Sequence, residues 1–510
     1  MTLDTLMSLL SWQNFALMVA IYFASLSIYR LFFHPLAQFP GPWLAAVTRY
    51  YEAYYDIVQN GQYTFKIAEL HKKYGPIIRI SPYELHVMDP AYFEKLYRHD
   101  GRWDKYAWAY DAFPAKGAII CTVDHYVHKA RRAPLNPLFS KAKVAGRQDL
   151  IRRHVETFCD KISEFAASGK SMNLGTATTA FTKNVATEFI LDKSFNNLDQ
   201  DFTATFKPPG KGSGYIWRVT KHIRWFEPTM RKLPTNWVIK NADAGASDHF
   251  KYLKQSMQDT KDLMTAAASS KASGDETPRT IVHAIVNSNL PAEEKEFGRV
   301  WPDVATVAGA GVDTTASVLR LIFYHVFSDA GILKTLRAEL ASANIQSSSL
   351  DTVELRTLEQ LPYLTGVLME GLRLSPAIAS RMARIAPDRD LYYGERRIPA
   401  RTPIGMTILL IHTNESLYPE PKRFHPDRWT DLEARKKAEK TFAPFSRGTR
   451  NCLGMYLAWA EMYHVVAAVV QRFDFQFEGA SAKDFECESD QFAIRTYGGG
   501  ILNTRVSLRQ

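Results

Sequence analysis

The sequence predicts a mainly helical protein with small β-sheets, an α+β fold, preceded by an N-terminal transmembrane helix. The first observation behind this prediction is an uncharged, largely apolar segment at residues 5–29. The second is the helical character of the central region, roughly residues 145–375. The third is a set of short strand-like segments on either side of that region, at 77–88 and 385–412. With 46% apolar and 23% charged residues, the 510-residue chain has an ordinary globular composition.

The N-terminal segment has the composition of a membrane-spanning helix. Residues 5–29 carry no formal charge, and about 20 apolar residues cross a bilayer as a helix. Arg30 follows directly, and positive charge on the exit side places the rest of the chain in the cytoplasm. A secretory signal is disfavoured because Asp4, and no basic residue, precedes the segment. Gln13 and Asn14 weaken the span and leave a tilted or re-entrant anchor as the alternative.

A stiff connector separates this segment from the remaining chain. The sequence "HPLAQFPGP" (34–42) holds three prolines and one glycine in nine residues, which cannot continue a helix. We therefore expect an anchor at 1–33, a hinge at 34–44 and one globular domain at 45–510.

Two further segments predict local structure. Residues 266–278, "AAASSKASGDETP", are rich in Ser, Ala and Gly and predict a surface loop. The three glycines at 498–500 predict the turn of a C-terminal hairpin. Strands are expected from Ile77 to Ile80 and from Glu84 to Met88.

The formal net charge of +10 is compatible with nucleic acid, an anionic membrane surface or an acidic protein as partner. The densest basic runs are 128–132 and 433–440, and the second is mixed in sign, as on a solvated helix face. No block of five or six consecutive basic residues occurs. We expect no nucleic-acid partner.

One cysteine stands in an unusual place. In "FSRGTRNCLG" (445–454), Cys452 comes directly before a long apolar helix predicted at 453–473. A thiol at a helix N-terminus faces unpaired N–H groups and the positive end of the dipole, which lower its pKa and favour a metal-binding thiolate. Gly448 permits a tight turn with positive φ. The other cysteines are scattered, show no CxxC spacing and are interpreted as small buried residues: Cys121, Cys159 and Cys487.

The same ten residues resemble the haem-binding signature of cytochromes P450, Phe-x-x-Gly-x-Arg-x-Cys-x-Gly. All five defining positions match: Phe445, Gly448, Arg450, Cys452 and Gly454. The resemblance implies a cytochrome P450 fold and a haem b (iron protoporphyrin IX) whose iron is bound by the cysteine thiolate, which favours O–O cleavage. It also implies that Arg450 binds a haem propionate.

A second motif lies in residues 304–327, a segment apolar almost all round, as in a buried core helix. Asp313 and Thr314 interrupt it beside two glycines that cost about 1 kcal/mol each of helix stability. Thr314 can bond the Ala310 carbonyl and open the helix there. The segment resembles the family's Ala-Gly-x-Asp/Glu-Thr-Thr motif. This implies that Thr314 steadies the iron-bound peroxide and that Asp313 feeds protons through water, help worth about 10²- to 10⁴-fold.

Further resemblances concern charged residues. "EGLR" (370–373) alone predicts an ordinary surface ion pair, but with "PKRFHPDRW" (421–429) it resembles the family's buried structural network. Its members here are Glu370, Arg373 and Arg428. "HKARRAPLNPLF" (128–139) resembles the Trp-x-x-x-Arg helix that contacts a propionate, with Arg132 in the arginine place and His128 in that of the tryptophan. Arg384 fits the other propionate contact, and Arg381 lies close enough to be confused with it.

The likeness extends from the proline hinge to the C-terminus, and residues 54–87 resemble fungal secondary-metabolism P450s of the trichodiene-oxygenase-like type. The implied protein is a haem-thiolate monooxygenase, anchored by a single pass in the endoplasmic reticulum membrane. It would oxidise a small lipophilic substrate, a terpenoid or polyketide, with electrons from NADPH through a separate NADPH–cytochrome P450 reductase. Substrate contacts are expected in 106–122, near Thr306 and Ala310, and at 377–380 and 496–497. A haem-thiolate isomerase or dehydratase that needs no O₂ is disfavoured by the acid–alcohol pair, and a non-catalytic haem carrier or sensor is the third possibility.

Overall fold

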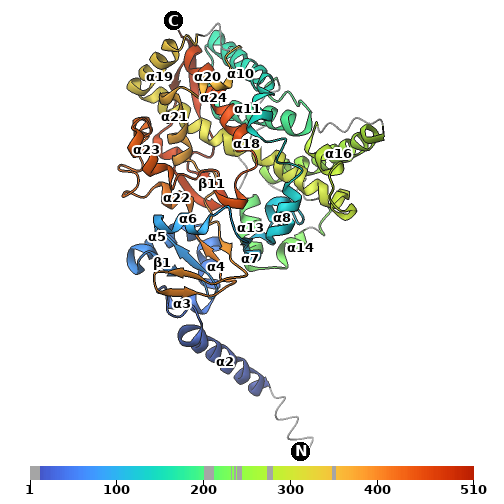
Figure 1. Cartoon of the computed structure of the whole chain (residues 1–510), viewed down its shortest axis with the longest axis vertical. Helices are drawn as coiled ribbons and strands as arrows, with labels where there is room; N and C mark the ends of the chain where they lie inside the picture. Colours follow the sequence, from blue (N-terminus) through green and yellow to red (C-terminus); the bar gives the residue numbers. More distant parts are fainter. Residues whose placement is uncertain are drawn as a thin grey trace, which may run out of the picture.

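Long helices form most of the protein, as the sequence predicts (Figure 1). The computed structural model describes residues 12–199, 212–230, 232–234, 237, 240, 244–272, 279–346 and 352–509. In the described part, the helices longer than ten residues are α2 (Trp12–Ile28), α5 (Tyr63–Tyr74), α10 (Gln148–Ser168), α11 (Leu174–Leu191), α13 (Gly212–His222), α16 (Ala244–Ala272), α18 (Phe297–Ser328), α19 (Ala330–Ser342), α21 (Pro362–Leu374) and α24 (Met455–Arg472). Shorter helices that matter below are α4 (Tyr50–Ala53), α6 (Pro90–Leu96), α7 (Ala107–Tyr110), α8 (His125–Arg132), α14 (Phe226–Met230), α22 (Ile408–His412) and α23 (Leu432–Glu439).

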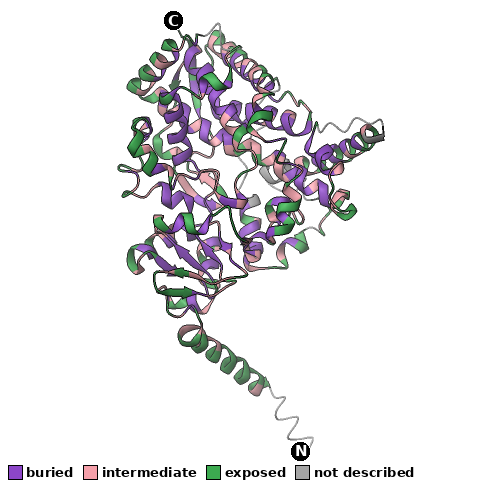
Figure 2. Ribbon diagram, viewed as in Figure 1, coloured by how far each residue is buried: buried purple, intermediate pink, exposed green. Residues whose placement is uncertain are grey.

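The centre of the helical body is α18, which contacts α11, α16, α21 and α24 (Figure 1). Its side chains Val304, Leu319 and Phe323 are completely buried, and they belong to the same core cluster as Val466 of α24 and Phe181 of α11. Burying one such side chain contributes roughly 1.5–3 kcal/mol. Figure 2 shows these inner helices as mostly buried. The predicted apolar helix at 304–327 is therefore the core helix of the protein.

A five-stranded sheet lies beside the helical body, toward the N-terminal helix α2 (Figure 1). Its strand order is β1 (Ile77–Arg79), β2 (Leu85–Val87), β8 (Ile404–Gly405), β5 (Arg384–Ile385) and β3 (Asp104–Lys105). The first two strands pair antiparallel and confirm the strands predicted within 77–88. β3 and β5 come from distant parts of the sequence and also pair antiparallel.

Three smaller sheets complete the fold. They are β4 (Met172–Asn173) with β12 (Asn503–Leu508) and β9 (Phe473–Phe477), β6 (Leu391–Tyr393) with β7 (Arg396–Ile398), and β10 (Cys487–Gln491) with β11 (Ala493–Thr496). The predicted C-terminal hairpin around 498–500 is wrong. β11 turns back on β10 through Phe492, whereas the chain beyond Gly500 crosses to another sheet, where β12 pairs with the apolar strand β9.

The predicted loop at 266–278 is also wrong in its first half. Residues 266–272 continue helix α16, because alanine is the best helix former and four of these seven residues are alanine. Residues 273–278 lie outside the described part of the chain.

The N-terminal helix projects from the body, and its residues are largely exposed (Figures 1 and 2). α2 continues into the π-helical turn Tyr29–Phe33, giving a 22-residue candidate membrane span, Trp12–Phe33, with mean hydropathy 1.8. Arg79 Nη1 donates to the Arg30 carbonyl at 2.7 Å, and Arg30 Nη1 donates to the Val47 carbonyl at 2.5 Å. These bonds fix the base of the helix to the globular domain.

Candidate functional site

The loop before α24 holds Cys452 in a defined conformation. Its backbone N–H donates to the Phe445 carbonyl at 2.8 Å, which closes the loop, and the Phe445 ring lies 6.2 Å from that of Trp459. Gly448 has φ +75°, and a Cβ at this position would lie 2.4 Å from the Arg98 carbonyl oxygen. Only glycine satisfies both conditions, so the predicted turn is confirmed.

The expected lowering of the Cys452 pKa is not what the structure shows. Burial raises the pKa of this thiol, and the Gly454 N–H and the charge of Arg132 offset the rise only in part. The helix begins at Met455, so Cys452 precedes the first turn rather than capping it. An isolated thiolate is therefore unfavourable here, and a bound cation is what would stabilise it.

Cys452 faces an enclosed space. Its side chain is classed as exposed, as are those of Ala310 and Asp313 in the middle of α18. Yet burial is the largest cause of the pKa shifts of both Cys452 and Asp313, so these groups lie deep in the protein. The free surface of these groups therefore lies inside the protein.

The two predicted catalytic residues lie in the middle of α18. Thr314 Oγ1 donates to the Ala310 carbonyl at 2.8 Å, as the sequence predicts, but α18 runs unbroken through this point. Burial raises the pKa of Asp313, while the charges of Arg320 and Lys183 oppose the rise. A carboxyl group with a raised pKa holds a proton more readily than a solvated one, as a proton carrier requires.

Two buried arginines, Arg450 of the Cys452 loop and Arg384 of β5, have unused hydrogen-bond donors. Arg450 donates to the carbonyls of Thr122 and Val123, both at 2.7 Å, yet its Nε has no hydrogen-bond partner. Arg384 donates to two neighbouring carbonyls, and its Nη2 is without a partner. Burial, followed by the charge of Arg384, lowers the pKa of Arg450 to about 10.

Arg381 and Arg384 differ in their ion pairs. Arg381 is ion-paired with Glu52 at 2.9 Å and with Glu84 at 2.7 Å, and both carboxylates are 1% exposed. Arg384 makes no ion pair among the described residues. Of these two arginines, therefore, only Arg384 has charge and hydrogen-bonding capacity left for a ligand.

The α8 residues lie at the same site. Arg132 donates to the carbonyls of Asn451 and Cys452, the second at 3.4 Å. Burial lowers the pKa of His128 to about 2, and Arg450 and Lys105 add to the effect. His128 is thus a neutral imidazole among cations. Lys105 is a site residue that sequence reasoning missed, because its neighbourhood depends on the pairing of two two-residue strands.

The predicted charged network is present, with Glu370 and Arg373 completely buried and Arg428 10% exposed. Arg373 and Arg428 both bind Glu370, at 2.7 and 3.1 Å, and Trp429 Nε1 donates to the same carboxylate at 2.9 Å. Arg373 also donates to the carbonyls of His412 and Pro421. The network ties α21 to α22 and to the segment that leads to the Cys452 loop.

A cavity of about 700 Å³ lies between the predicted contact segment 106–122 and α13–α14. Trp108, Tyr110 and Cys121 line it from the first segment. Thr220 and Arg224 line it from α13 and the turn that follows, and sequence reasoning missed both. This volume is typical of small-molecule sites.

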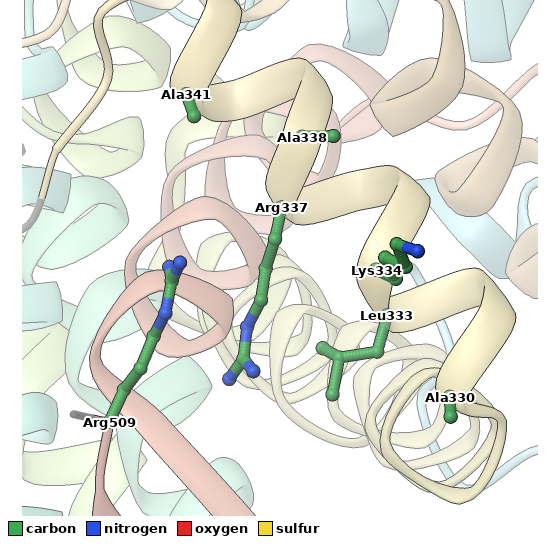
Figure 3. Close-up of a pocket in the computed structure, with 7 residues that line it drawn as sticks. All are labelled: Ala330, Leu333, Lys334, Arg337, Ala338, Ala341 and Arg509. Atoms are coloured by element: carbon green, nitrogen blue, oxygen red, sulfur yellow. The ribbon is translucent and has the colours of Figure 1, made fainter.

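A second hollow, of about 500 Å³, lies between α19 and the C-terminal strand (Figure 3). It includes none of the predicted site residues. The Arg337 guanidinium there forms an ion pair with Asp474 at 2.8 Å and donates hydrogen bonds to the Val470 and Phe473 carbonyls. We assign this hollow no part in the site.

The residues present fit the cofactor that the sequence implies. The Cys452 thiol makes no disulfide, has free surface and lies deep in the protein. Buried arginine N–H groups without partners lie close by, as carboxylates on the cofactor's edge require.

The model of the cytochrome P450 family matches residues 53–502. Cytochrome P450 monooxygenase tpcC of Cochliobolus heterostrophus is 38% identical over 91% of this chain and 87% of its own length. Tryptophan 6-hydroxylase fscE of Fusarium equiseti is 36% identical, covering 92% of this chain and 91% of the relative. Conidiogenone synthase PchP450 of Penicillium rubens is 33% identical over 98% and 99% of the two chains.

Proposed function

Because the chain belongs to the cytochrome P450 family, we propose that it is a membrane-anchored monooxygenase that inserts one atom of O₂ into a small lipophilic secondary metabolite. That it is a haem-dependent oxidoreductase with fungal monooxygenase relatives of secondary metabolism is the premise. The observation that carries the proposal is the Asp313–Thr314 pair in the middle of the core helix α18, with the Asp313 carboxyl group deep in the protein, as the Cys452 thiol is.

Cys452 would bind the haem iron through sulfur, and Arg132, Arg384 and Arg450 would bind the propionates. Phe445 and Gly448 shape the loop that holds the sulfur in place, and His128 borders the propionate side as a neutral donor. When bound, the haem supplies the iron on which O₂ is reduced and activated.

Asp313 and Thr314 would manage the protons of the reaction. The Thr314 hydroxyl donates its proton to the Ala310 carbonyl, which leaves its oxygen free to accept a hydrogen bond. Asp313 carries a raised pKa and stands beside two cations, Arg320 and Lys183, that moderate it. An acid with these neighbours can pass a proton inward and regain one from solvent, which an isomerase or a haem carrier does not need.

The substrate would bind beside α18, and it would reach that position through the 700 Å³ cavity. Its walls combine aromatic rings with polar groups, which suits a terpenoid or polyketide that carries some polar substituents. Relatives named for tryptophan hydroxylation and for conidiogenone synthesis show that similar chains act on different scaffolds.

The anchor and the electron supply complete the proposal. Residues 1–33 would cross the endoplasmic reticulum membrane once, 34–44 would form the hinge, and 45–510 would be the cytoplasmic catalytic domain. Electrons would come from NADPH through a separate NADPH–cytochrome P450 reductase, and the net charge of +10 suits an acidic docking face.

The deciding experiment uses the full-length chain co-expressed with a reductase in membranes. Reduced protein with carbon monoxide should show an absorption band at about 450 nm, as expected for a thiolate ligand. Cys452→Ser should abolish this band. Candidate metabolites with NADPH and isotopically labelled O₂ should give a product that contains one labelled atom. Product without label would favour the isomerase, and a carbon monoxide band without NADPH-dependent O₂ uptake would favour the haem carrier.

A further inference from the structure

The two glycines that flank Ala310 in α18 each face a neighbouring helix. A Cβ at Gly311 would lie 2.8 Å from the Cβ of Ala186 in α11, a distance that two methyl groups cannot adopt without a shift. A Cβ at Gly309 would lie 3.2 Å from the hydroxyl oxygen of Tyr252 in α16. Glycine destabilises a helix interior relative to alanine, and the close approach of these neighbours explains why both positions hold it.

The approach at Gly309 is a polar one. The Tyr252 hydroxyl donates to the Ala305 carbonyl of α18 at 2.7 Å. Burial and the charge of Asp259 raise the pKa of Tyr252, whereas a hydrogen bond from the Gly309 backbone N–H opposes the rise. In an α-helix the N–H of residue 309 and the carbonyl of residue 305 are each other's partners. The Tyr252 hydroxyl therefore contacts both ends of one backbone hydrogen bond of α18.

This contact lies next to the predicted catalytic pair. Ala310, which follows Gly309 in the chain, provides the carbonyl that accepts the Thr314 hydroxyl at 2.8 Å. Asp313 lies one helical turn beyond Gly309. A side chain that inserts at a backbone hydrogen bond changes the local course of a helix. The position of the Ala310 carbonyl, and with it that of the Thr314 hydroxyl, therefore depends on where Tyr252 holds the helix.

We infer that Tyr252 is a positioning residue for the oxygen chemistry: from α16 it fixes the turn of α18 that places the Thr314 hydroxyl. This inference rests on the proposed monooxygenase function. Tyr252 acts through α18 and keeps Thr314 where the reaction gives product. When that position is lost, more O₂ leaves as hydrogen peroxide, in which it has taken up two electrons and two protons.

Simple packing of α16 on α18 is the competing explanation. In that case loss of the Tyr252 hydroxyl would lower stability and leave the use of electrons unchanged. The same pair of helices offers a matched control, because Trp301 Nε1 of α18 donates to Ser256 Oγ of α16 at 2.9 Å. Ser256 lies one turn from Tyr252 along α16, and Trp301 lies one turn from Ala305 along α18, on the side away from Thr314.

The first test examines the contact between Tyr252 and Gly309 and needs no turnover. In ferric full-length protein, Gly309→Ala should lower the unfolding temperature, because the new methyl group crowds the Tyr252 hydroxyl. In the Tyr252→Phe background the same change should raise it. Alanine is the better helix former, and the nearest ring carbon then lies at an ordinary contact distance, 3.7 Å. An equal effect of Gly309→Ala in both backgrounds would overturn the inference.

The second test measures how electrons are used, with reductase, NADPH and a metabolite that the original protein oxidises. Tyr252→Phe should lower the product formed per NADPH about threefold, as for the loss of one hydrogen bond, and release correspondingly more hydrogen peroxide. Ser256→Ala should lower the unfolding temperature but keep the original ratio of product to NADPH. In the Thr314→Ala background, Tyr252→Phe should change this ratio no further, because the group that it positions is absent.

Two results of the second test would overturn the inference in favour of packing. One is a lower unfolding temperature of Tyr252→Phe with an unchanged ratio of product to NADPH. The other is an equal loss of product per NADPH from Tyr252→Phe in the original and Thr314→Ala backgrounds. Absence of the carbon monoxide band or of NADPH-dependent O₂ uptake in the original protein would instead refute the proposed function, on which the first test does not depend.

Discussion

Glu370 and Arg373 face each other one helical turn apart on α21, both completely buried, with two hydrogen bonds of 2.7 and 2.9 Å between them. The bidentate geometry leaves the carboxylate one further edge, which Arg428 and the Trp429 indole occupy. The guanidinium uses its remaining donors on backbone carbonyls. Every polar atom of this interior pair therefore has a use, and the pair joins α21 to the chain that precedes the Cys452 loop.

Removing the charge of Glu370 should destabilise the protein strongly. Glu370→Gln leaves Arg373 buried without compensation, which costs about 3–5 kcal/mol in comparable buried pairs. Thermal unfolding should shift down by many degrees, and expressed protein should incorporate less haem. The control is Glu69→Gln in α5, which breaks an exposed pair of the same i,i+3 spacing at 2.7 Å and should cost less than about 1 kcal/mol. Equal shifts for the two variants would contradict the assigned role.

How much of this site was predictable depends on the range of the interactions. The Cys452 loop, the turn at Gly448 and the Thr314–Ala310 bond involve residues close in sequence, and motif and turn chemistry predicted them. Lys105 escaped notice because its partner Arg384 lies in another two-residue strand far along the chain. Such pairings follow from the whole fold and leave no local pattern.

Two errors have the same origin. The Cys452 pKa was expected to fall from a local feature, the helix N-terminus, but burial by the surrounding protein outweighs it. The C-terminal glycines do turn the chain, with φ +59° at Gly499 and +88° at Gly500, but they direct it to a different sheet. Glycine permits a turn without specifying which strand is met afterwards.

The two neighbouring arginines should behave differently when replaced by glutamine. Arg384→Gln should accelerate haem loss about tenfold, because a charge-assisted bond to a propionate is lost. Arg381→Gln should mainly lower the unfolding temperature, since Glu52 and Glu84 would remain buried without their cation. Haem transfer to apomyoglobin and thermal unfolding, measured on both variants, separate the two effects. Faster haem loss from Arg381→Gln and a lower unfolding temperature for Arg384→Gln would contradict both assignments.

Acid should destabilise the domain through a buried histidine pair. His71 Nε2 and His86 Nδ1 are 2.7 Å apart, and burial lowers the pKa of His71 from 6.5 to about 4. The unfolded chain therefore binds more protons, so stability is complete above about pH 6.5 and falls as the pH drops toward 4, by up to about 1.4 kcal/mol per unit for one imidazole.

The test of this pH dependence is the unfolding temperature measured between pH 7.5 and 4.5. His71→Gln keeps a hydrogen-bonding side chain but does not titrate, so it should flatten the slope in that window. His99→Gln removes an exposed imidazole and should leave the slope as it is. An unchanged slope in the first variant would show that His71 does not contribute.

Asp313 should control how reducing equivalents are used. Asp313→Asn preserves the size of the side chain but cannot supply a proton, so product formation should fall about 10²-fold. NADPH consumption should fall less, with the difference appearing as hydrogen peroxide, because O₂ is still reduced when protons no longer reach the right atom. Ser317→Ala is the matched control: its hydroxyl donates to the Thr314 carbonyl at 2.9 Å, one turn away. That variant should keep the original ratio of product to NADPH. If Asp313→Asn kept it as well, protons would have to arrive by a route that does not involve this side of α18.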